Sequence, residues 1–314
     1  MDVKIKLAVR DWDYLAPLAL GDIKPDRFEL EVHRVNTLPS LGTEIHYEAV
    51  ELSFSQYAQA VARGDDSFIG LPHFLMRAFR HRCIITAKDS TTNCIEDLAG
   101  KRIGVTGWQD SGNTWTRALL ARAGVAIDDV RWYAGRLTSS HPIVDRLGRY
   151  ARANRIEAAP GERPLVELLL AGELDAVFTP FMPPNFFSAD SRLRFMLNDF
   201  RSAERIYFNE VGYVPGIHML GIKSATLKAF PWLGQALSEV LDESTRIWSE
   251  RRMKYADTTP WLLDDIRRTT LELPANWNDN GITENTAMIN DFATELFTQG
   301  IVDRRLEAKE LFPC

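Results

Sequence analysis

The sequence has few cysteines and no long apolar run. Its 314 residues include only three cysteines, Cys83, Cys94 and Cys314, and their spacing matches no metal-binding pattern. An odd number of unpatterned cysteines is typical of reduced thiols, which excludes a disulfide framework. No stretch of about 20 apolar residues occurs, so we expect no helix that spans a membrane.

An excess of basic charge is also absent. The chain has 37 Lys and Arg against 43 Asp and Glu, a net charge of -6, which argues against a general nucleic-acid-binding protein. Residues 1–9 enter an alternating strand pattern directly, without the apolar segment and cleavage site of a secretory signal. We therefore expect a cytoplasmic protein with neither a nucleic acid nor a membrane as partner.

The common catalytic and cofactor motifs are missing as well. The sequence has no phosphate loop, no dinucleotide fingerprint, no Gly-x-Ser-x-Gly elbow and no His-Glu-x-x-His metal motif. We therefore predict no cofactor. A divalent cation held by His81, His218 and a carboxylate such as Glu51 is an open alternative, although no spacing demands it.

Short apolar strand patterns alternate with helical patterns along the chain. This alternation predicts an α/β fold with mostly parallel sheets. Strands are expected at residues 5–9, 28–32, 49–52, 83–86, 101–105, 130–133, 175–179, 193–196 and 217–222. Helices are expected at residues 53–64, 110–123, 163–171, 231–252, 260–271 and 283–299.

The most informative stretch is residues 77–81, which holds Arg77, Arg80 and His81 directly after an apolar run. On a helical turn these three side chains would share one face. Arg binds carboxylate oxygens in pairs, and His can carry a proton near neutral pH. The segment therefore favours a carboxylate-binding site. A solvated basic turn paired with surface acids is the alternative.

Residues 71–81 resemble the 4,5-dihydroxyphthalate decarboxylases and their relatives. The similarity extends over roughly residues 45 to 250 through a series of shorter matching segments. These segments are residues 97–105, 115–120, 155–159, 169–176, 217–222 and 231–233. Together their order and spacing are fairly specific.

The arrangement also looks like the two-lobe fold of type II periplasmic binding proteins, with a cleft between the lobes. By that resemblance, lobe one is formed by residues 1–88 and 200–314, and lobe two is the inserted segment 89–199. Two crossing segments near residues 83–86 and 213–220 would join the lobes.

Ligands of open α/β sheets bind past the carboxyl ends of the strands, where helix N-termini point. Besides Arg77 and Arg80, this rule selects six candidate substrate-binding residues: Asp11, Ser53, Ser55, Trp108, Gln109 and Asn113. Helices that start at Ser53 and Ser111 would direct N–H groups toward a dicarboxylate. Ser53 as a simple cap, Trp108 as a core residue and Asn113 as the closure of a helical turn are the alternatives.

The resemblance implies cofactor-independent decarboxylation of a hydroxylated aromatic (di)carboxylic acid such as 4,5-dihydroxyphthalate. The reaction needs a proton at the carbon that loses carbon dioxide. We expect His81 or His218 to transfer that proton and Glu51 to act on the ring hydroxyl. Trp108 would pack the ring, and Arg77 with Arg80 would bind carboxylate.

The alternative function is a non-catalytic solute-binding protein or sensor for a small carboxylate, because the fold is shared between such proteins and enzymes. The sequence leaves a homo-oligomer open.

Overall fold

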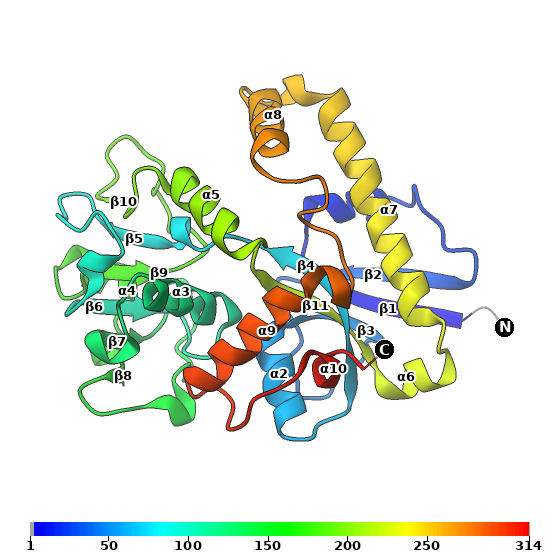
Figure 1. Ribbon diagram of the computed structural model, residues 1–314, viewed down its shortest axis with the longest axis horizontal. Coiled ribbons are helices and arrows are strands. Elements are labelled where there is room, and N and C mark those ends of the chain that lie inside the picture. Colours follow the sequence, from blue (N-terminus) through cyan, green and yellow to red (C-terminus); the bar gives the residue numbers. More distant parts are fainter. Residues whose placement is uncertain (1–2, 314) are drawn as a thin grey trace. The chain divides into compact units, whose positions relative to one another are not determined.

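The computed structural model describes residues 3–313 and divides them into two compact units (Figure 1). The first unit contains residues up to 77, residues 216–290 and residues from 306 onward. The second contains residues 78–215 and 291–305. The chain thus passes from one unit to the other four times. None of the helices in residues 3–313 is long and apolar enough to cross a membrane.

The unit boundaries differ from the expected ones. Residues 78–88, 200–215 and 291–305, which were expected in lobe one, belong to the second unit. The physical reason is strand pairing, since the strand after Cys83 pairs only with strands of the second unit. The expected crossing at 83–86 therefore lies inside that unit, and the first crossing falls between Arg77 and Ala78.

The first unit is built on a five-stranded sheet of order β2-β1-β3-β11-β4. Its strands are β1 (Val3–Val9), β2 (Phe28–Arg34), β3 (Ala49–Ser53), β4 (Phe68–Arg77) and β11 (Gly216–Lys223). Strand β1 runs parallel to β2 and β3, and β11 runs antiparallel to β3 and β4. Its helices are α1 (Ala16–Ala19), α2 (Phe54–Ala62), α6 (Ser224–Ala229), α7 (Leu233–Lys254), α8 (Leu262–Glu272) and α10 (Ala308–Leu311).

The second unit has a six-stranded sheet of order β10-β5-β9-β6-β7-β8. Its strands are β5 (Ile84–Ala87), β6 (Arg102–Val105), β7 (Arg131–Ala134), β8 (Ile156–Ala158), β9 (Ala176–Phe178) and β10 (Leu193–Phe195). Strand β6 is parallel to β7 and β9, whereas β5 is antiparallel to both its neighbours. Its helices are α3 (Ser111–Arg122), α4 (Leu165–Leu170) and α5 (Phe200–Val211), and α9 (Ile282–Thr298) is divided between the units.

The predicted α/β class with mostly parallel sheets is confirmed, and each expected strand and long helix is present with ends shifted by a few residues. Strands β4 and β8, helix α5 and the short helices α1, α6 and α10 were not among the predicted elements. Apolar side chains of the strands and of α7 form the core of the first unit, including Leu7, Leu220 and Leu237. Cys83 is buried and Cys94 is exposed, both as free thiols, and Cys314 lies outside the described residues.

The prediction that residues 77–81 form a helical turn is wrong. Strand β4 continues to Arg77, and a short 3-10 helix, η2, spans His81–Cys83. Because β4 contains Pro72, the sequence did not indicate that the strand continues as far as Arg77. A proline is tolerated there because β4 is an edge strand of its sheet. A backbone N–H on the outer side of an edge strand has no neighbouring strand to pair with, so its absence removes no hydrogen bond of the sheet.

Candidate functional site

A buried carboxylate–imidazole pair in the first unit is the strongest candidate site. Glu51 in β3 is completely buried, and its Oε1 lies 2.6 Å from Nδ1 of His218 in β11. Its Oε2 accepts hydrogen bonds from the backbone N–H of Arg10 at 2.8 Å and from the indole N–H of Trp12 at 2.9 Å. We call Glu51 and His218 the dyad.

The strand register brings the dyad together. In the antiparallel pair of β3 and β11, His218 is opposite Ser53 and Leu220 is opposite Glu51. Glu51 and His218 are therefore diagonal neighbours on one face of the sheet, which is within reach of long side chains. The flanking Ile217 and Met219 are buried on the other face.

The dyad has the chemistry of an oriented proton carrier. We assign the proton on Nδ1 to the bond with Glu51, because a carboxylate that already accepts two other bonds acts as an acceptor. This assignment fixes the tautomer and the ring orientation and leaves Nε2 for a ligand. Nearby, the Tyr14 hydroxyl donates to the carbonyl of Leu75, and burial, helped by the Glu51 charge, raises the pKa of Tyr14.

Glu51 itself is not placed to act on a ligand hydroxyl. Its side chain has no exposed surface, and both oxygens already face donors from its own unit. The geometry gives it the role of orienting His218.

Arg80 is a second unusual group, and it lies in the second unit. Its side chain is buried, with 3% of the residue exposed, and Nη1 and Nη2 have no hydrogen-bond partner among the described residues. Nε donates weakly to Oγ1 of Thr116 at 3.4 Å. Burial lowers the pKa of this guanidinium. A buried cation without a bound acid is costly unless an anion joins it.

The Arg80 guanidinium packs on the first turn of α3. A Cβ atom on Gly112 would lie 2.6 Å from Nη2, so only glycine admits the guanidinium there. A helix N-terminus carries partial positive charge, and the Asp110 side chain makes no capping bond to it. Two positive groups are thus juxtaposed, which is the electrostatic environment of an anion-binding site.

His81 is not part of the dyad. It belongs to the second unit, is 4% exposed, and its ring meets that of Tyr207 edge-on at 5.5 Å. Burial lowers its pKa to about 4, so it is neutral at physiological pH. Within residues 3–313, no group of three or more His, Cys, Asp or Glu side chains is arranged to hold a metal ion.

Arg77 is engaged within the first unit. Its Nη1 donates to Oδ1 of Asn285 at 2.8 Å, and Nη2 donates to the carbonyl of Asp279 at 2.9 Å. The guanidinium also covers the ring of Phe74, 4.8 Å from its centroid. Burial lowers its pKa to about 10. Arg77 therefore ties the start of α9 and the segment before it to β4.

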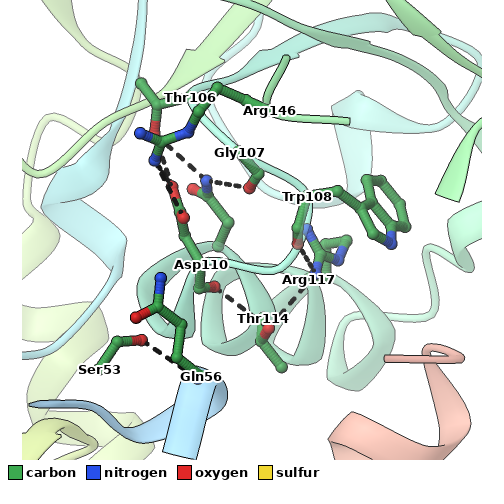
Figure 2. A network of polar contacts seen from close by, with 10 residues as sticks. Ser53, Gln56, Thr106, Gly107, Trp108, Asp110, Thr114, Arg117 and Arg146 are labelled. Carbon is green, nitrogen blue, oxygen red and sulfur yellow. Dashed lines mark hydrogen bonds and ion pairs between the residues drawn. The ribbon is translucent and has the colours of Figure 1, made fainter. Parts of the chain in front are cut away.

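Trp108 is a core residue and not an exposed stacking surface for a ligand ring. It is 1% exposed, its ring meets Trp132 edge-on at 5.6 Å, and the Arg117 guanidinium lies 4.0 Å from its centroid. Arg117 also donates to the Trp108 carbonyl at 2.7 Å (Figure 2). The expectation that Trp108 packs a substrate ring fails because the loop before α3 turns its indole into the unit.

The rest of this loop is held by internal hydrogen bonds. Asn113 donates to the carbonyl of Gly107 at 2.8 Å and more weakly to Oγ1 of Thr106, so its amide closes the loop. The Asp110 carboxylate points to Arg146, 3.0 Å away (Figure 2). Gln109 is half-buried and its Oε1 has no hydrogen-bond partner among the described residues, so it remains a candidate ligand contact.

The remaining candidates lie in the first unit. Ser53 is the N-cap of α2, and its hydroxyl accepts from the N–H of Gln56 at 3.5 Å (Figure 2). Ser55 is fully buried and accepts from the Gln59 amide. Asp11 is exposed and pairs with Arg34 at 2.9 Å, which is typical of a surface ion pair.

Sequence reasoning missed several groups that shape these sites. Trp12, which supplies the indole N–H to Glu51, lies in a loop that the strand-end rule had selected. Arg117 and Gln299, joined at 2.7 Å, had no signal in the sequence. No pattern in the sequence singled out Glu204 in α5 either. Burial raises its pKa to about 7, and its Oε1 has no hydrogen-bond partner among the described residues.

Glu204→Gln should change how stability depends on pH. Folding raises the pKa of Glu204, so the folded state favours the protonated carboxyl, and stability falls as pH rises toward and through about 7. The substitution should raise the free energy of unfolding by about 2 kcal/mol at pH 8 and by much less at pH 5. Urea unfolding at both pH values measures this. Glu210→Gln, at an exposed position of the same helix, is the control and should show no such difference.

The fold of this chain is periplasmic-binding-protein-like, as predicted. The chain is similar to the sulphonate-binding protein SsuA from Escherichia coli, with a TM-score of 0.58 and 12% identity over 99% of this chain and 92% of that one. The Candida albicans CA3427 gene product, described as having the generic periplasmic binding protein fold, gives a TM-score of 0.54 and 14% identity over 98% and 94%. The desulfurization enzyme DSZB gives 0.53 and 13% over 99% and 96%.

The predicted resemblance to 4,5-dihydroxyphthalate decarboxylases is also confirmed. A protein of that name from Comamonas testosteroni is 28% identical over 99% of this chain and 96% of its own. Another from Pseudomonas putida is 32% identical over 53% of this chain and 65% of its own. Residues 78–146 match the family described as NMT1/THI5 like.

Proposed function

We propose that this protein is a decarboxylase of hydroxylated aromatic carboxylic acids, with 4,5-dihydroxyphthalate as the leading substrate. The dyad is the observation that carries the proposal. A buried carboxylate with three donors around it, one of them an imidazole, is a costly arrangement that serves to orient the imidazole. Similarity to two proteins named as such decarboxylases supports the reaction class and the choice of substrate.

The dyad matches the difficult step of this reaction. A ring hydroxyl ortho or para to the leaving carboxylate donates electron density into the ring. Protonated His218 transfers the proton on Nε2 to the ring carbon that bears the carboxylate. The bond from that carbon to the carboxylate then breaks, carbon dioxide leaves, and the electron pair restores the aromatic ring. The Glu51 carboxylate stabilises the positive imidazole before the transfer, and solvent returns the proton afterwards.

For the second unit, we propose that Arg80 and the first turn of α3 bind a carboxylate anion such as phthalate. The unpartnered Nη1 and Nη2 provide the planar fork that suits two carboxylate oxygens. Arg77 has no corresponding free fork, because Asn285 and Asp279 occupy it. Of the two arginines, only Arg80 is therefore proposed as a carboxylate anchor.

Carbon dioxide release from three acids tests the reaction class. The purified protein should release carbon dioxide from 4,5-dihydroxyphthalate and more slowly from 3,4-dihydroxybenzoate, which lacks the second carboxylate. Phthalate has no hydroxyl to activate the ring, so it should bind without reacting. Each assay is run with a chelator and with added divalent cation. Tight binding of all three acids without release under either condition would overturn the enzyme proposal in favour of a carboxylate receptor.

A further inference from the structure

Three side chains of the second unit, Arg80, His81 and Glu204, carry buried polar atoms that have no hydrogen-bond partner among residues 3–313. The atoms are Nη1 and Nη2 of Arg80, Nδ1 of His81 and Oε1 of Glu204. Arg80 and His81 are at the start of η2, and Glu204 is in α5. Buried polar atoms in folded proteins nearly always have partners, so neighbouring atoms without them indicate a place where a ligand binds.

The packing of α5 on η2 brings these side chains together. The Glu204 carboxylate accepts a hydrogen bond from the backbone N–H of Arg82 in η2. Tyr207 is three residues after Glu204 and therefore on the same face of α5, and its ring meets that of His81 at 5.5 Å. Glu204 thus faces the turn that carries the proposed anion anchor.

The Glu204 carboxyl is poised between its two charge states. The positive charges of Arg82, Arg201 and Arg80 each lower its pKa, but burial outweighs them and raises the pKa to about 7. About half of the molecules therefore carry a proton on Glu204 at neutral pH.

The charge of Glu204 acts on Arg80 in return, because it raises the pKa of the guanidinium against the effect of burial. An ionised Glu204 offsets part of the positive field of Arg80 and repels an arriving anion, whereas a protonated Glu204 does neither. Conversely, an anion bound at Arg80 adds negative charge beside Glu204 and raises the pKa of Glu204 further. The two binding events must strengthen each other, because such coupling is reciprocal.

Two other neighbours keep one charge state near neutral pH. Burial lowers the pKa of His81 to about 4 and raises that of Tyr207 to about 12, so both are neutral. Arginine side chains stay charged. The remaining charged or titratable groups that act on Glu204 or on Arg80 are Arg82, Cys83, Asp110 and Arg201.

We infer that the second unit binds an anion and a proton together, the anion at Arg80 and the proton on Glu204. The inference rests on the carboxylate anchor of the proposed function, and it uses neither the dyad nor the reaction. It adds that anion binding at this site strengthens as the pH falls through neutrality.

Calorimetry with phthalate tests the coupling. If the bound anion strengthens proton binding to Glu204 by about tenfold, Kd should be about 6-fold lower at pH 6.5 than at pH 8.5. Under the same assumption, the protein should take up about half a proton per bound phthalate near pH 7.5. Heats measured in buffers of different ionisation enthalpy give this number. Both carboxyl groups of phthalate are ionised over this range, so the ligand takes up almost no proton itself.

Glu204→Gln assigns the proton, because the amide imitates a carboxyl that is always neutral. This variant should bind phthalate at pH 8.5 about as tightly as the unaltered protein does at pH 6.5. Its affinity should not depend on pH, and it should take up no proton. Glu210→Gln, at an exposed position of the same helix, is the matched control and should keep both the pH dependence and the proton uptake.

The possible failures are distinguishable. Phthalate binding that requires Arg80 but takes up no proton would overturn this inference and leave the anchor standing. Proton uptake that persists in Glu204→Gln would assign the proton to another group and would also overturn it. Phthalate affinity that is unchanged in Arg80→Met, or no phthalate binding by the unaltered protein, would refute the anchor and this inference with it.

Discussion

Replacing His218 with Asn should lower the rate of carbon dioxide release by about 10²–10⁴-fold while the affinity for phthalate stays within a few-fold of the unaltered protein. A positioned acid contributes a factor of this size when a proton must reach a carbon atom. Asn is smaller than His, but its amide can still donate a hydrogen bond on the side where Nδ1 of His218 meets Glu51. Steady-state kinetics with 4,5-dihydroxyphthalate and calorimetry with phthalate measure the two quantities.

Glu51→Gln tests whether the two groups act together. The amide cannot stabilise a positive imidazole, so turnover should fall, although by less than in His218→Asn. If Glu51 acts only through His218, the double variant should be no slower than His218→Asn alone, because coupled groups are not additive. His46→Asn, at an exposed position, is the control. Normal turnover in His218→Asn would exclude the dyad as the proton source, provided that circular dichroism shows a folded protein.

Replacing Arg80 with Met should weaken binding of phthalate by about 2–5 kcal/mol, which is at least about a 30-fold increase in Kd. The buried Arg80 guanidinium supplies the formal positive charge of the proposed anchor, and water competes poorly inside a buried site. Arg80→Lys keeps the charge but loses the paired geometry, so it should recover only part of the affinity. Calorimetry with phthalate measures both variants.

The stability of Arg80→Met in the absence of ligand separates binding from a structural role. A buried charge without a carboxylate partner stabilises the fold little, so its removal should leave the unfolding midpoint unchanged or raise it. Arg131→Met removes an exposed charge from the same unit and should change neither quantity. A large loss of stability in Arg80→Met with unchanged phthalate affinity would make Arg80 a structural residue and would refute the proposed anchor.

Local sequence patterns predicted most elements of the fold because their signals are short-range. The alternation of Val, Ile and Leu marked the strands, and Ser53 with Gln56 three residues later marked the start of α2. Residues 77–81 were misread because Arg spacing carries no information about backbone conformation. Helix α5 was not predicted, although it is amphipathic and buries Tyr207 and Phe208.

The candidate site residues were only partly predictable, because the direction of a side chain depends on contacts that are distant along the chain. Glu51 and His218 were both selected from the sequence, but as separate groups with separate tasks. Trp108 was expected to contact a ligand and is instead enclosed by Trp132 and Arg117. Residue type limits what a side chain can do, whereas its direction depends on neighbours that are distant along the chain.

The sequence by itself determined the α/β class, the order of the strands along the chain and the resemblance to the decarboxylases, since these depend on local periodicity and residue identity. Only the tertiary structure decided which groups act together. The register of β3 against β11 joined Glu51 to His218 across 167 positions. The division of the chain after Arg77 separated it from Arg80. Burial then left Nη1 and Nη2 of Arg80 without a hydrogen-bond partner among residues 3–313, because desolvation depends on what surrounds a charge and not on the residues beside it in the chain.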